Sequence, residues 1–453
     1  MNTPPAPWTV MKFGGTSVAT AERWQTIIQQ MQRCQANGER PCVVVSAVTT
    51  VTNRMSDCIN EALRNIQPSE PGCAFQQVKE VHLKLIAELG LNSLAEDSNT
   101  PNASFYVSGL QVIHGLLDDL EQLLNGVRLT REESDPSASP RIHARISAFG
   151  ELLSSQIGLL AIRSAGVPCV RLDSRRLLTS TESTTQQSED SFLEANVDPL
   201  IDAVLVIKEI TRSCKELSSV EGGAPSGYAA TCGVITQGFI ASTPKGSTCL
   251  LGRGGSDTSA ALLAALFDAK RLEIWTDVHG LFTSDPRHVS NTRLIRDVSY
   301  RVAQELASMG AKVLHPRCLI PAAWAGIPVE IHNTNDPMGP FSTILRSELA
   351  PTPLELDRER QEIENASPDG YHSPVLSPAS RAASVAASVV AGGSSLELPS
   401  LSLATEASHV MVSEKNKKIY LFVFFLSFFN TLYWIINSEY CFQYEVLVLV
   451  FMI

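Results

Sequence analysis

Residues Val10–Val18 read VMKFGGTSV, an apolar strand-like segment that runs directly into two glycines, two hydroxyl side chains and a valine. Gly14 and Gly15 carry no Cβ, so the backbone at this turn can approach a phosphate closely. Amide groups at the start of a following helix offer partial positive charge, and Lys12 adds a full charge. The segment therefore predicts a strand–turn–helix unit that holds a phosphate, although a plain tight turn can have the same sequence.

Strand-like and helical segments continue to alternate outward from this unit, through about residue 345. Short apolar runs separated by helical periodicity indicate βαβ units around a largely parallel sheet. Thr20 is expected to cap the first helix, whose apolar residues recur at three- and four-residue steps. The expected strands are VMKF (10–13), CVVVSA (42–47), GVITQGFIA (233–241), LEIWT (272–276) and PVEIHN (328–333), with further helices within 99–156, after Asp257 and over about 300–309.

Composition and charge limit the classes of function. The chain has 453 residues, a net charge of −11, 44% hydrophobic and 18% charged residues, which is an ordinary balance for two or three globular domains. No run of Lys and Arg interleaves with aromatic residues, so nucleic acid is not expected as a partner. The ten cysteines show no C-x-x-C pair, and they are expected to be reduced, buried and intracellular. The opening MNTPPAPW has no secretory signal pattern, so the globular part of the chain is expected to be cytoplasmic.

Two later segments carry polar side chains at places where parallel sheets bind ligands. In LLGRGGSDTSAALLAAL (250–266), Arg253 is held by glycines beside Asp257, an arrangement that suits a zwitterionic ligand, although Asp is also a common helix cap. In EIWTDVHGLFTSDPR (273–287), Thr276 and Asp277 follow a buried strand at its carboxyl end. Asp285-Pro286 is interpreted mainly as a turn, from which Arg287 can still reach a phosphate.

The sequence changes character after residue 345. Residues 346–413, rich in Pro, Ser and Ala, are expected to form a disordered linker, and 414–453 an apolar tail. Within the tail, IYLFVFFLSFFNTLYWII (419–436) has about the length of a membrane span, and the preceding lysines would keep its amino side cytosolic. The tail uses few residue types, mainly Phe, Ile, Leu, Tyr, Asn and Lys, and this composition also fits a translated non-coding sequence. Both readings stay open, so a membrane anchor is one of two interpretations.

Six segments in this order, KFGGTSVA, FGELLSS, ITQGFIAS, GRGGSD, WTDVHGLFTSDPR and MGAKVLHP, resemble the aspartate kinase family. The resemblance covers about Val10 to Leu345. It implies an α/β fold of the amino-acid-kinase (carbamate-kinase-like) type, a three-layer αβα sandwich with a central, mostly parallel sheet. The implied catalytic domain spans 8–345, with aspartate bound by about 8–227 and ATP by about 228–345.

The same resemblance implies roles for individual residues. Lys12 would contact the transferring phosphoryl group, and Mg²⁺ would bridge the ATP phosphates without a protein metal cage. Glu151 and Asp257 would face the ammonium of aspartate. The implied catalytic residues are Lys12, Arg253 and Asp257; the aspartate site is Thr52, Glu151, Phe239, Arg253, Ser256 and Asp257; the ATP site is Lys12, Gly14, Gly15, Thr16, Ser17, Thr276, Asp277, Phe282, Arg287 and Lys312. The alternative, non-functional interpretations are an acidic side chain on a helix surface for Glu151 and a solvated charge at a strand end for Lys312. His315 is interpreted as a core or capping histidine.

Several positions depart from the family pattern. Thr258 and Phe282 stand where tyrosines are usual, and MGPFSTIL (338–345) departs from a PGT ending, so modulation of activity is expected more than its loss. The paired ACT modules that usually follow the kinase domain, bind lysine or threonine and help form the dimer are not recognised after Leu345. End-product inhibition by the usual route is therefore in doubt, and a homodimer is left open.

The implied reaction is transfer of the ATP γ-phosphoryl group to the β-carboxylate of L-aspartate, giving 4-phospho-L-aspartate on the route to lysine, threonine and methionine. The alternative is an inactive or regulatory, membrane-tethered homologue. Kinases of glutamate, acetylglutamate or UMP share the fold, but the combination of KFGGTS, FGELLSS and WTD argues against them. A fused homoserine dehydrogenase is excluded by length and by the lack of a later G-x-G-x-x-G segment.

Overall fold

The computed structural model divides the chain into two compact units, Met1–Thr352 and Pro353–Ile453. Each unit is considered by itself. The residues described are 6–97, 100, 102–130, 140–181, 190–197, 210, 232–309, 313–345, 408–413, 418–423 and 445–450.

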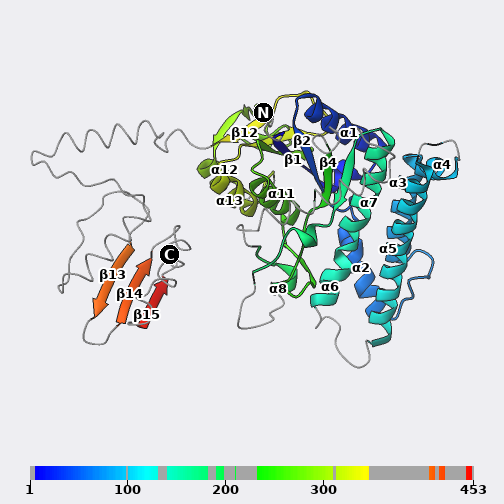
Figure 1. The fold of residues 1–453 in the computed structure, drawn as a ribbon, viewed down its shortest axis with the longest axis horizontal. Coiled ribbons are helices and arrows are strands. Elements are labelled where there is room, and N and C mark those ends of the chain that lie inside the picture. The colour runs from blue at the N-terminus through cyan, green and yellow to red at the C-terminus, as the bar shows by residue number, and fades with distance from the viewer. Residues whose placement is uncertain are drawn as a thin grey trace, which may run out of the picture. The chain divides into compact units, whose positions relative to one another are not determined.

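An eight-stranded sheet forms the centre of the first unit (Figure 1), in the order β10-β12-β11-β7-β1-β2-β4-β3. The six strands from β11 to β3 are mutually parallel, and only the edge formed by β12 and β10 runs the other way. The mostly parallel α/β sheet is thus confirmed. The strands are β1 (Trp8–Phe13), β2 (Arg40–Val45), β3 (Cys169–Leu172), β4 (Gly233–Gln237), β7 (Arg271–Thr276), β10 (Asp297–Ser299), β11 (Val329–Asn333) and β12 (Ser342–Leu345).

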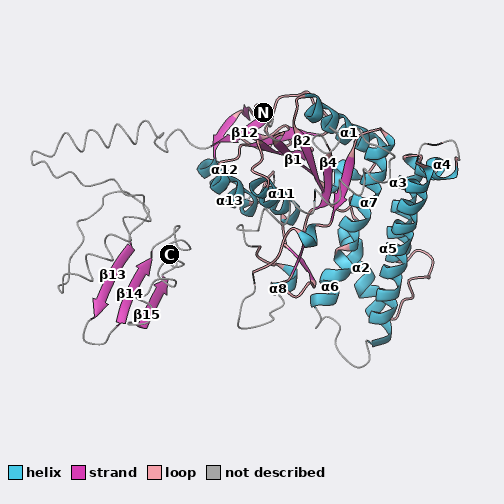
Figure 2. Ribbon diagram, in the orientation of Figure 1, coloured by secondary structure: helices cyan, strands magenta, loops and turns pink. Residues whose placement is uncertain are grey.

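Helices cover both faces of this sheet (Figure 2), because successive side chains of a buried strand point to opposite sides. On β1, Met11 packs into the core shared with α1 (Ala21–Ala36) and α7 (Phe149–Ser164). Its neighbour Val10 packs into the second core, shared with α11 (Gly255–Leu266) and α13 (Pro316–Ala325). The two cores confirm the three-layer sandwich.

The first helix begins where the sequence places it. The Thr20 side chain accepts a hydrogen bond from Arg23 N at 3.4 Å, as expected of a cap. The helical region predicted within 99–156 is also present, and it packs beside further helices on one side of the molecule (Figure 1). These helices are α2 (Val51–Leu63), α3 (Ala74–Glu88), α4 (Leu91–Glu96), α5 (Ala103–Thr130) and α6 (Pro140–Ser147), and α12 (Tyr300–Ser308) confirms the helix expected near 300–309.

One expected strand is divided in the structure. Residues 233–241 were predicted as a single strand, but β4 ends at Gln237 and β5 (Ile240–Ser242) turns away to pair with β6 (Thr248–Leu250). Phe239 between them has a left-handed φ of 66°, which no continuous strand accommodates. A Cβ on Gly238 would lie 2.7 Å from Ser256 Cβ, so α11 approaches the chain closely at this break. The remaining short elements are η1 (Gly15–Val18), η3 (Ser174–Arg176), α8 (Asp190–Leu193), β8 (Leu281–Phe282) and β9 (Leu294–Ile295).

The second unit differs from the sequence reading where it is described. Three strands, β13 (Ser408–Ser413), β14 (Lys418–Val423) and β15 (Glu445–Val450), form a sheet in that order. A disordered linker had been expected over 346–413, but its residues 408–413 form β13. An apolar span had been expected over 419–436, but its residues 419–423 belong to β14. The rest of both segments lies outside the described residues. Among the described residues, no helix is both long and apolar enough to cross a membrane.

The cysteines of the described residues are buried and free of disulfides, as expected. Burial raises the pKa of several of them, including Cys34 to about 12. Cys214 and Cys441 lie outside the described residues.

Candidate active site

Lys12 near the end of β1 meets Asp257 in the first turn of α11. Lys12 Nζ lies 2.6 Å from Asp257 Oδ1, and the two side chains are only 13% and 14% exposed. At this separation the ammonium and the carboxylate form a close, largely buried ion pair. Two motifs far apart in the sequence thereby place one ammonium and one carboxylate at the carboxyl edge of the sheet.

The glycine turn after β1 is packed against the end of β2. A Cβ on Gly15 would lie 2.7 Å from the backbone oxygen of Ala47, and one on Gly14 would lie 3.7 Å from Lys12 Nζ. Both glycines therefore meet a need for close approach, and Gly14 leaves space next to the lysine head. Thr16 in this turn is exposed and accessible to a ligand.

Ser17, predicted for the ATP site, also has a structural contact in this turn. Its side chain is buried, and its hydroxyl shares a hydrogen bond of 2.9 Å with Thr334 Oγ1 just beyond β11. Thr334 N in turn donates to the backbone oxygen of Thr276 at 2.8 Å. In this structure Ser17 fixes the turn to the neighbouring strand ends.

Glu151 at the start of α7 is buried, which rules out the alternative of a surface acid. Its Oε1 accepts a hydrogen bond of 3.2 Å from Ala47 N, whereas Oε2 is buried with no partner among the described residues. Burial raises the pKa of Glu151 to about 8. The preceding Gly150 allows this approach, since a Cβ there would lie 2.7 Å from Ala47 Cβ. A buried carboxylate oxygen without a partner is suited to a cationic ligand.

The start of α11 is joined to its surroundings by hydroxyl groups. Ser46 Oγ donates to Ser256 Oγ at 2.9 Å, and Phe239 N donates to Ser259 Oγ at 3.0 Å. A Cβ on Gly255 would lie 2.8 Å from the Phe239 ring, so this ring is packed against the first residue of the helix. The predicted pocket residues Phe239 and Ser256 thus lie on adjoining segments.

Arg253 is exposed on the loop that leads into α11, between Gly252 and Gly254, which both have left-handed φ angles. It forms no ion pair within the described residues and can bind an external anion. His315 accepts a hydrogen bond from Arg317 N at 3.4 Å and caps α13, which confirms its interpretation as a capping histidine. Burial, followed by Arg317 and Arg253, lowers the pKa of His315.

Thr52 lies in the first turn of α2 and is exposed. The loop before it, which follows β2, supplies the Ala47 amide that holds Glu151. Thr52 is therefore connected to the Glu151 contact through the short loop that joins β2 to α2.

The residues predicted for the nucleotide are spread more widely. Thr276 at the end of β7 donates to Asp277 Oδ1 at 3.2 Å, and Phe282 lies in β8, half-buried. Arg287 is 67% exposed, and its guanidinium pairs with the Asp285 carboxylate in the same turn at 2.9 Å. That pairing lowers the pKa of Asp285. Lys312 lies outside the described residues.

Sequence reasoning missed several groups at this edge. Ser46 and the Ala47 amide come from the end of β2, and Thr334 follows β11. The rule that ligands bind beyond the carboxyl ends of parallel strands could have indicated all three. Every residue except proline has a backbone amide, so the residue type at position 47 could not indicate that its amide binds Glu151.

Another cluster of titratable groups lies within the sheet. Glu273, Glu330 and His332 offer atoms within 4.8 Å of one another, a spacing compatible with a cation. Glu273 is already bound by Arg271 at 2.7 Å and by Trp275 Nε1 at 3.0 Å, with Arg33 at 3.3 Å. These partners make the cluster a buried ion-pair network.

Comparisons with known proteins agree with this geometry. The profile of the Amino acid kinase family matches residues 7–213 and 232–333. The chain is 31% identical over 337 residues to the bifunctional aspartokinase/homoserine dehydrogenase 1, chloroplastic, of Zea mays, covering 74% of this chain and 32% of that protein. It is 32% identical over 328 residues to lysine-sensitive aspartokinase 3 of Escherichia coli K12, covering 72% of this chain and 62% of that protein.

Among solved structures, the crystal structure of E. coli aspartokinase III in complex with aspartate and ADP (R-state) aligns with a TM-score of 0.56 and 29% identity. The alignment covers 75% of this chain and 64% of that chain. The chain thus spans about a third of the length of the bifunctional relatives, and under two thirds of the lysine-sensitive enzyme.

Proposed function

The chain belongs to the amino acid kinase family, and from that membership we propose that it is an aspartate kinase, a phosphotransferase with a carboxyl group as acceptor. The observation that carries the proposal is the Lys12–Asp257 ion pair at the same sheet edge as the buried, half-satisfied carboxylate of Glu151. An amino-acid substrate needs a partner for its ammonium, and phosphoryl transfer needs positive charge at the transferred group.

Aspartate binds through its α-amino and α-carboxylate groups in this proposal. Oε2 of Glu151 and the carboxylate of Asp257 accept the ammonium, and Arg253 takes the α-carboxylate. The β-carboxylate is left free to attack. Thr52, Phe239 and Ser256 complete the pocket.

ATP occupies the adjoining glycine turn. Lys12 exchanges Asp257 for an oxygen of the γ-phosphate, and the amides of the Gly14–Gly15 turn face the phosphate chain. Thr16 and Ser17 complete this turn. Mg²⁺, when bound, neutralises the phosphate oxygens. Thr276, Asp277, Phe282, Arg287 and Lys312 form the remaining part of the proposed nucleotide site.

The chemical step is a single displacement. A β-carboxylate oxygen attacks the γ-phosphorus, the bond from that phosphorus to the bridging oxygen of ADP breaks, and the electron pair leaves with ADP. The attacking carboxylate is already ionised at neutral pH, so the step requires no general base. Lys12 stabilises the charge on the transferring group.

The product, 4-phospho-L-aspartate, is an acyl phosphate. We place it at the first step of lysine, threonine and methionine synthesis, in the cytoplasm. A homodimer is compatible with this role.

The test uses the full chain with ATP, Mg²⁺ and L-aspartate, and traps the acyl phosphate as its hydroxamate. L-Glutamate serves as the control substrate. Lys12→Ala should lower the rate by about 10²–10³-fold, because it removes the charge that follows the transferred group. The matched control is Lys84→Ala, whose side chain is 75% exposed on α3 and should leave the rate unchanged.

Two results would contradict the proposal. Equal product with glutamate would point to another acceptor. No product from a folded chain that binds ATP would favour an inactive or regulatory homologue.

A further inference from the structure

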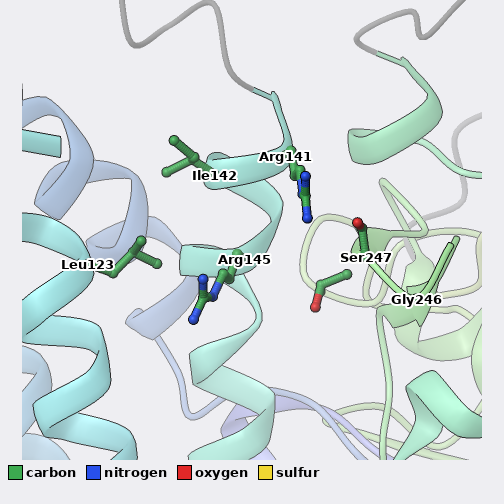
Figure 3. Close-up of a pocket in the computed structure, with 7 residues that line it drawn as sticks. Leu123, Arg141, Ile142, Arg145, Gly246 and Ser247 are labelled. Carbon is green, nitrogen blue, oxygen red and sulfur yellow. The ribbon is translucent and has the colours of Figure 1, made fainter. Parts of the chain in front are cut away.

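A cavity of about 530 Å³ lies away from the residues assigned to aspartate and ATP. It is bordered by α5, by α6 and by the turn that joins β5 to β6 (Figure 3). The residues that line it are Leu123, Arg141, Ile142, Arg145, Gly246, Ser247 and Thr248.

One wall of the cavity is positively charged. Arg141 and Arg145 are four residues apart on α6, so both lie on the same side of that helix, and both are exposed. Among the described residues, no acidic side chain lines the cavity and neither arginine forms an ion pair. The whole chain carries a net charge of −11, so two guanidinium groups that lack an acidic partner among the described residues are a local exception to the overall charge.

The opposite wall is a well-ordered turn with hydroxyl groups. Thr243 and Ser247 form two hydrogen bonds across the turn. Thr243 Oγ1 accepts a hydrogen bond from Ser247 N at 3.1 Å, and Thr243 N donates one to the Ser247 backbone oxygen at 2.7 Å. Gly246 has a left-handed φ of 78°, which this tight turn requires. Thr248 Oγ1 accepts a hydrogen bond of 3.3 Å from Arg175, which leaves its own proton available for a ligand.

We propose that this cavity binds a phosphate group carried on a small organic molecule. Two guanidinium groups can donate paired N–H bonds to phosphate oxygens, and the hydroxyls of Ser247 and Thr248 can donate from the other side. Leu123 and Ile142 add apolar surface that inorganic phosphate would not use. A phosphomonoester has a phosphate group for the arginines and hydroxyls and an organic part for the apolar side chains.

Such a ligand would hold α6 against the β5–β6 hairpin. Beneath the cavity, Ala144 and Ala148 pack with Leu152, Ile240 and Leu250 in one small buried cluster. The cluster thus spans α6, α7 and both strands of the hairpin. Bound phosphate would add a polar connection above this apolar one and slow the separation of the two elements.

Hydrogen exchange of the full chain tests the site without aspartate or ATP, so failure here leaves the proposed kinase activity untouched. The probes are glycerol 3-phosphate and inorganic phosphate, each titrated at constant ionic strength against chloride. We expect saturable slowing of exchange in residues 140–147 and 243–248, with the ester binding more tightly. Arg141→Gln/Arg145→Gln should weaken binding by at least about tenfold, because charge-assisted hydrogen bonds are lost.

Arg301→Gln is the matched control, since Arg301 is an exposed helical arginine on α12. It should leave ester binding unchanged, and each single variant, Arg141→Gln or Arg145→Gln, should give an intermediate loss. The proposal is overturned if exchange is slowed only around residues 12–17, if the double variant binds as the unmodified chain does, or if no saturable effect is seen.

Discussion

Glu151 illustrates how much a single side chain can decide in this molecule. One of its carboxylate oxygens is bound to an amide, and the other is buried without a partner among the described residues. With its pKa raised to about 8 by burial, most of the unliganded protein holds this group uncharged at pH 7. An ammonium ligand would require the ionised form, so binding and proton release are linked.

The first prediction follows from that linkage. Aspartate affinity should increase about tenfold per pH unit as the pH rises toward 8, and should level off above it, because the ionised fraction of Glu151 grows in that window. Calorimetric titration in buffers of different ionisation enthalpy should show proton release at pH 7. ATP titration provides the control. Aspartate affinity independent of pH between 6 and 8 would refute the assigned role.

The second prediction concerns stability. The pKa of Glu151 is higher in the folded chain than in the unfolded chain, so the free energy of unfolding should fall as pH rises from about 4.5 through 8. Glu151→Gln removes the ionisable group and should stabilise the unliganded protein at pH 9 by on the order of 5 kcal/mol, while abolishing aspartate binding. Denaturant unfolding at pH 4 and pH 9 measures both limits. A variant less stable than the parent at pH 9 would be inconsistent with an unpaired buried carboxylate.

At the scale of single residues, the sequence indicated candidate side chains for the site but not the groups that each of them contacts. Lys12, Asp257 and Glu151 were expected at the site, and the structure places two of them in direct contact. Arg287 was expected to face a phosphate but pairs with Asp285 in the structure, since the two are held together by a local turn. The neighbouring carboxylate competes with a phosphate for Arg287, and the sequence alone does not show how the turn orients these side chains.

Among the elements, α7 shows how tightly a helix is set against the sheet. A Cβ on Gly158 would lie 2.2 Å from the Trp24 ring and 2.6 Å from Ile235. Gly115 on α5 has nothing within 4 Å of the same added atom. The two helical glycines therefore differ only in the space around them.

This pair gives the third prediction. Gly158→Ala should destabilise the fold by about 1–3 kcal/mol through overpacking, whereas Gly115→Ala should stabilise it by about 0.5–1 kcal/mol through helix propensity. Chemical denaturation of both variants at neutral pH provides the comparison. Effects of equal sign would show that α7 can shift away from the sheet.

Helix α3 carries the fourth prediction. His82 is fully buried, its Nδ1 donates to the Val78 oxygen at 2.7 Å, and burial lowers its pKa to about 4. The unfolded chain binds this proton more readily, so stability should be lost as pH falls from about 6.5 toward 4, by on the order of 3 kcal/mol. His82→Leu should flatten that part of the pH profile in urea unfolding. An unchanged profile would assign the acid sensitivity to other groups.

Element types were predicted well because the apolar periodicity is strong, and the breaks were predicted less well. The segment 233–241 has an unbroken strand-like sequence, yet Phe239 adopts a left-handed φ, packs against Gly255 and donates its amide to Ser259 Oγ. Contact with α11, which lies later in the chain, thus overrides local propensity.

At the scale of the whole molecule, the α/β fold of the first unit was predictable from the sequence, and the strands described in the second unit were not. Six ordered motifs predicted the α/β architecture, and the strands that three of them contain, β1, β4 and β7, lie in one sheet. Beyond Leu345 no comparable constraint exists, and composition alone did not indicate the strands β13, β14 and β15.

The fifth prediction tests the division into units. A chain ending at Thr352 retains all eight strands of the central sheet and both large cores. Its thermal midpoint and its hydroxamate-forming rate should match those of the full chain. A loss of either by the shortened chain would show that residues 353–453 support the catalytic unit.

The central place of β1 limits how this molecule can move. β1 is paired along its length with β2 on one side and with β7 on the other, so the halves proposed for the two substrates share one continuous ladder. A hinge between those halves would have to break several parallel pairs in each catalytic cycle. If the proposed function holds, we therefore expect substrates to enter and leave through movement of the loops at the edge of the sheet, while the paired strands keep the phosphoryl donor and acceptor at a constant distance.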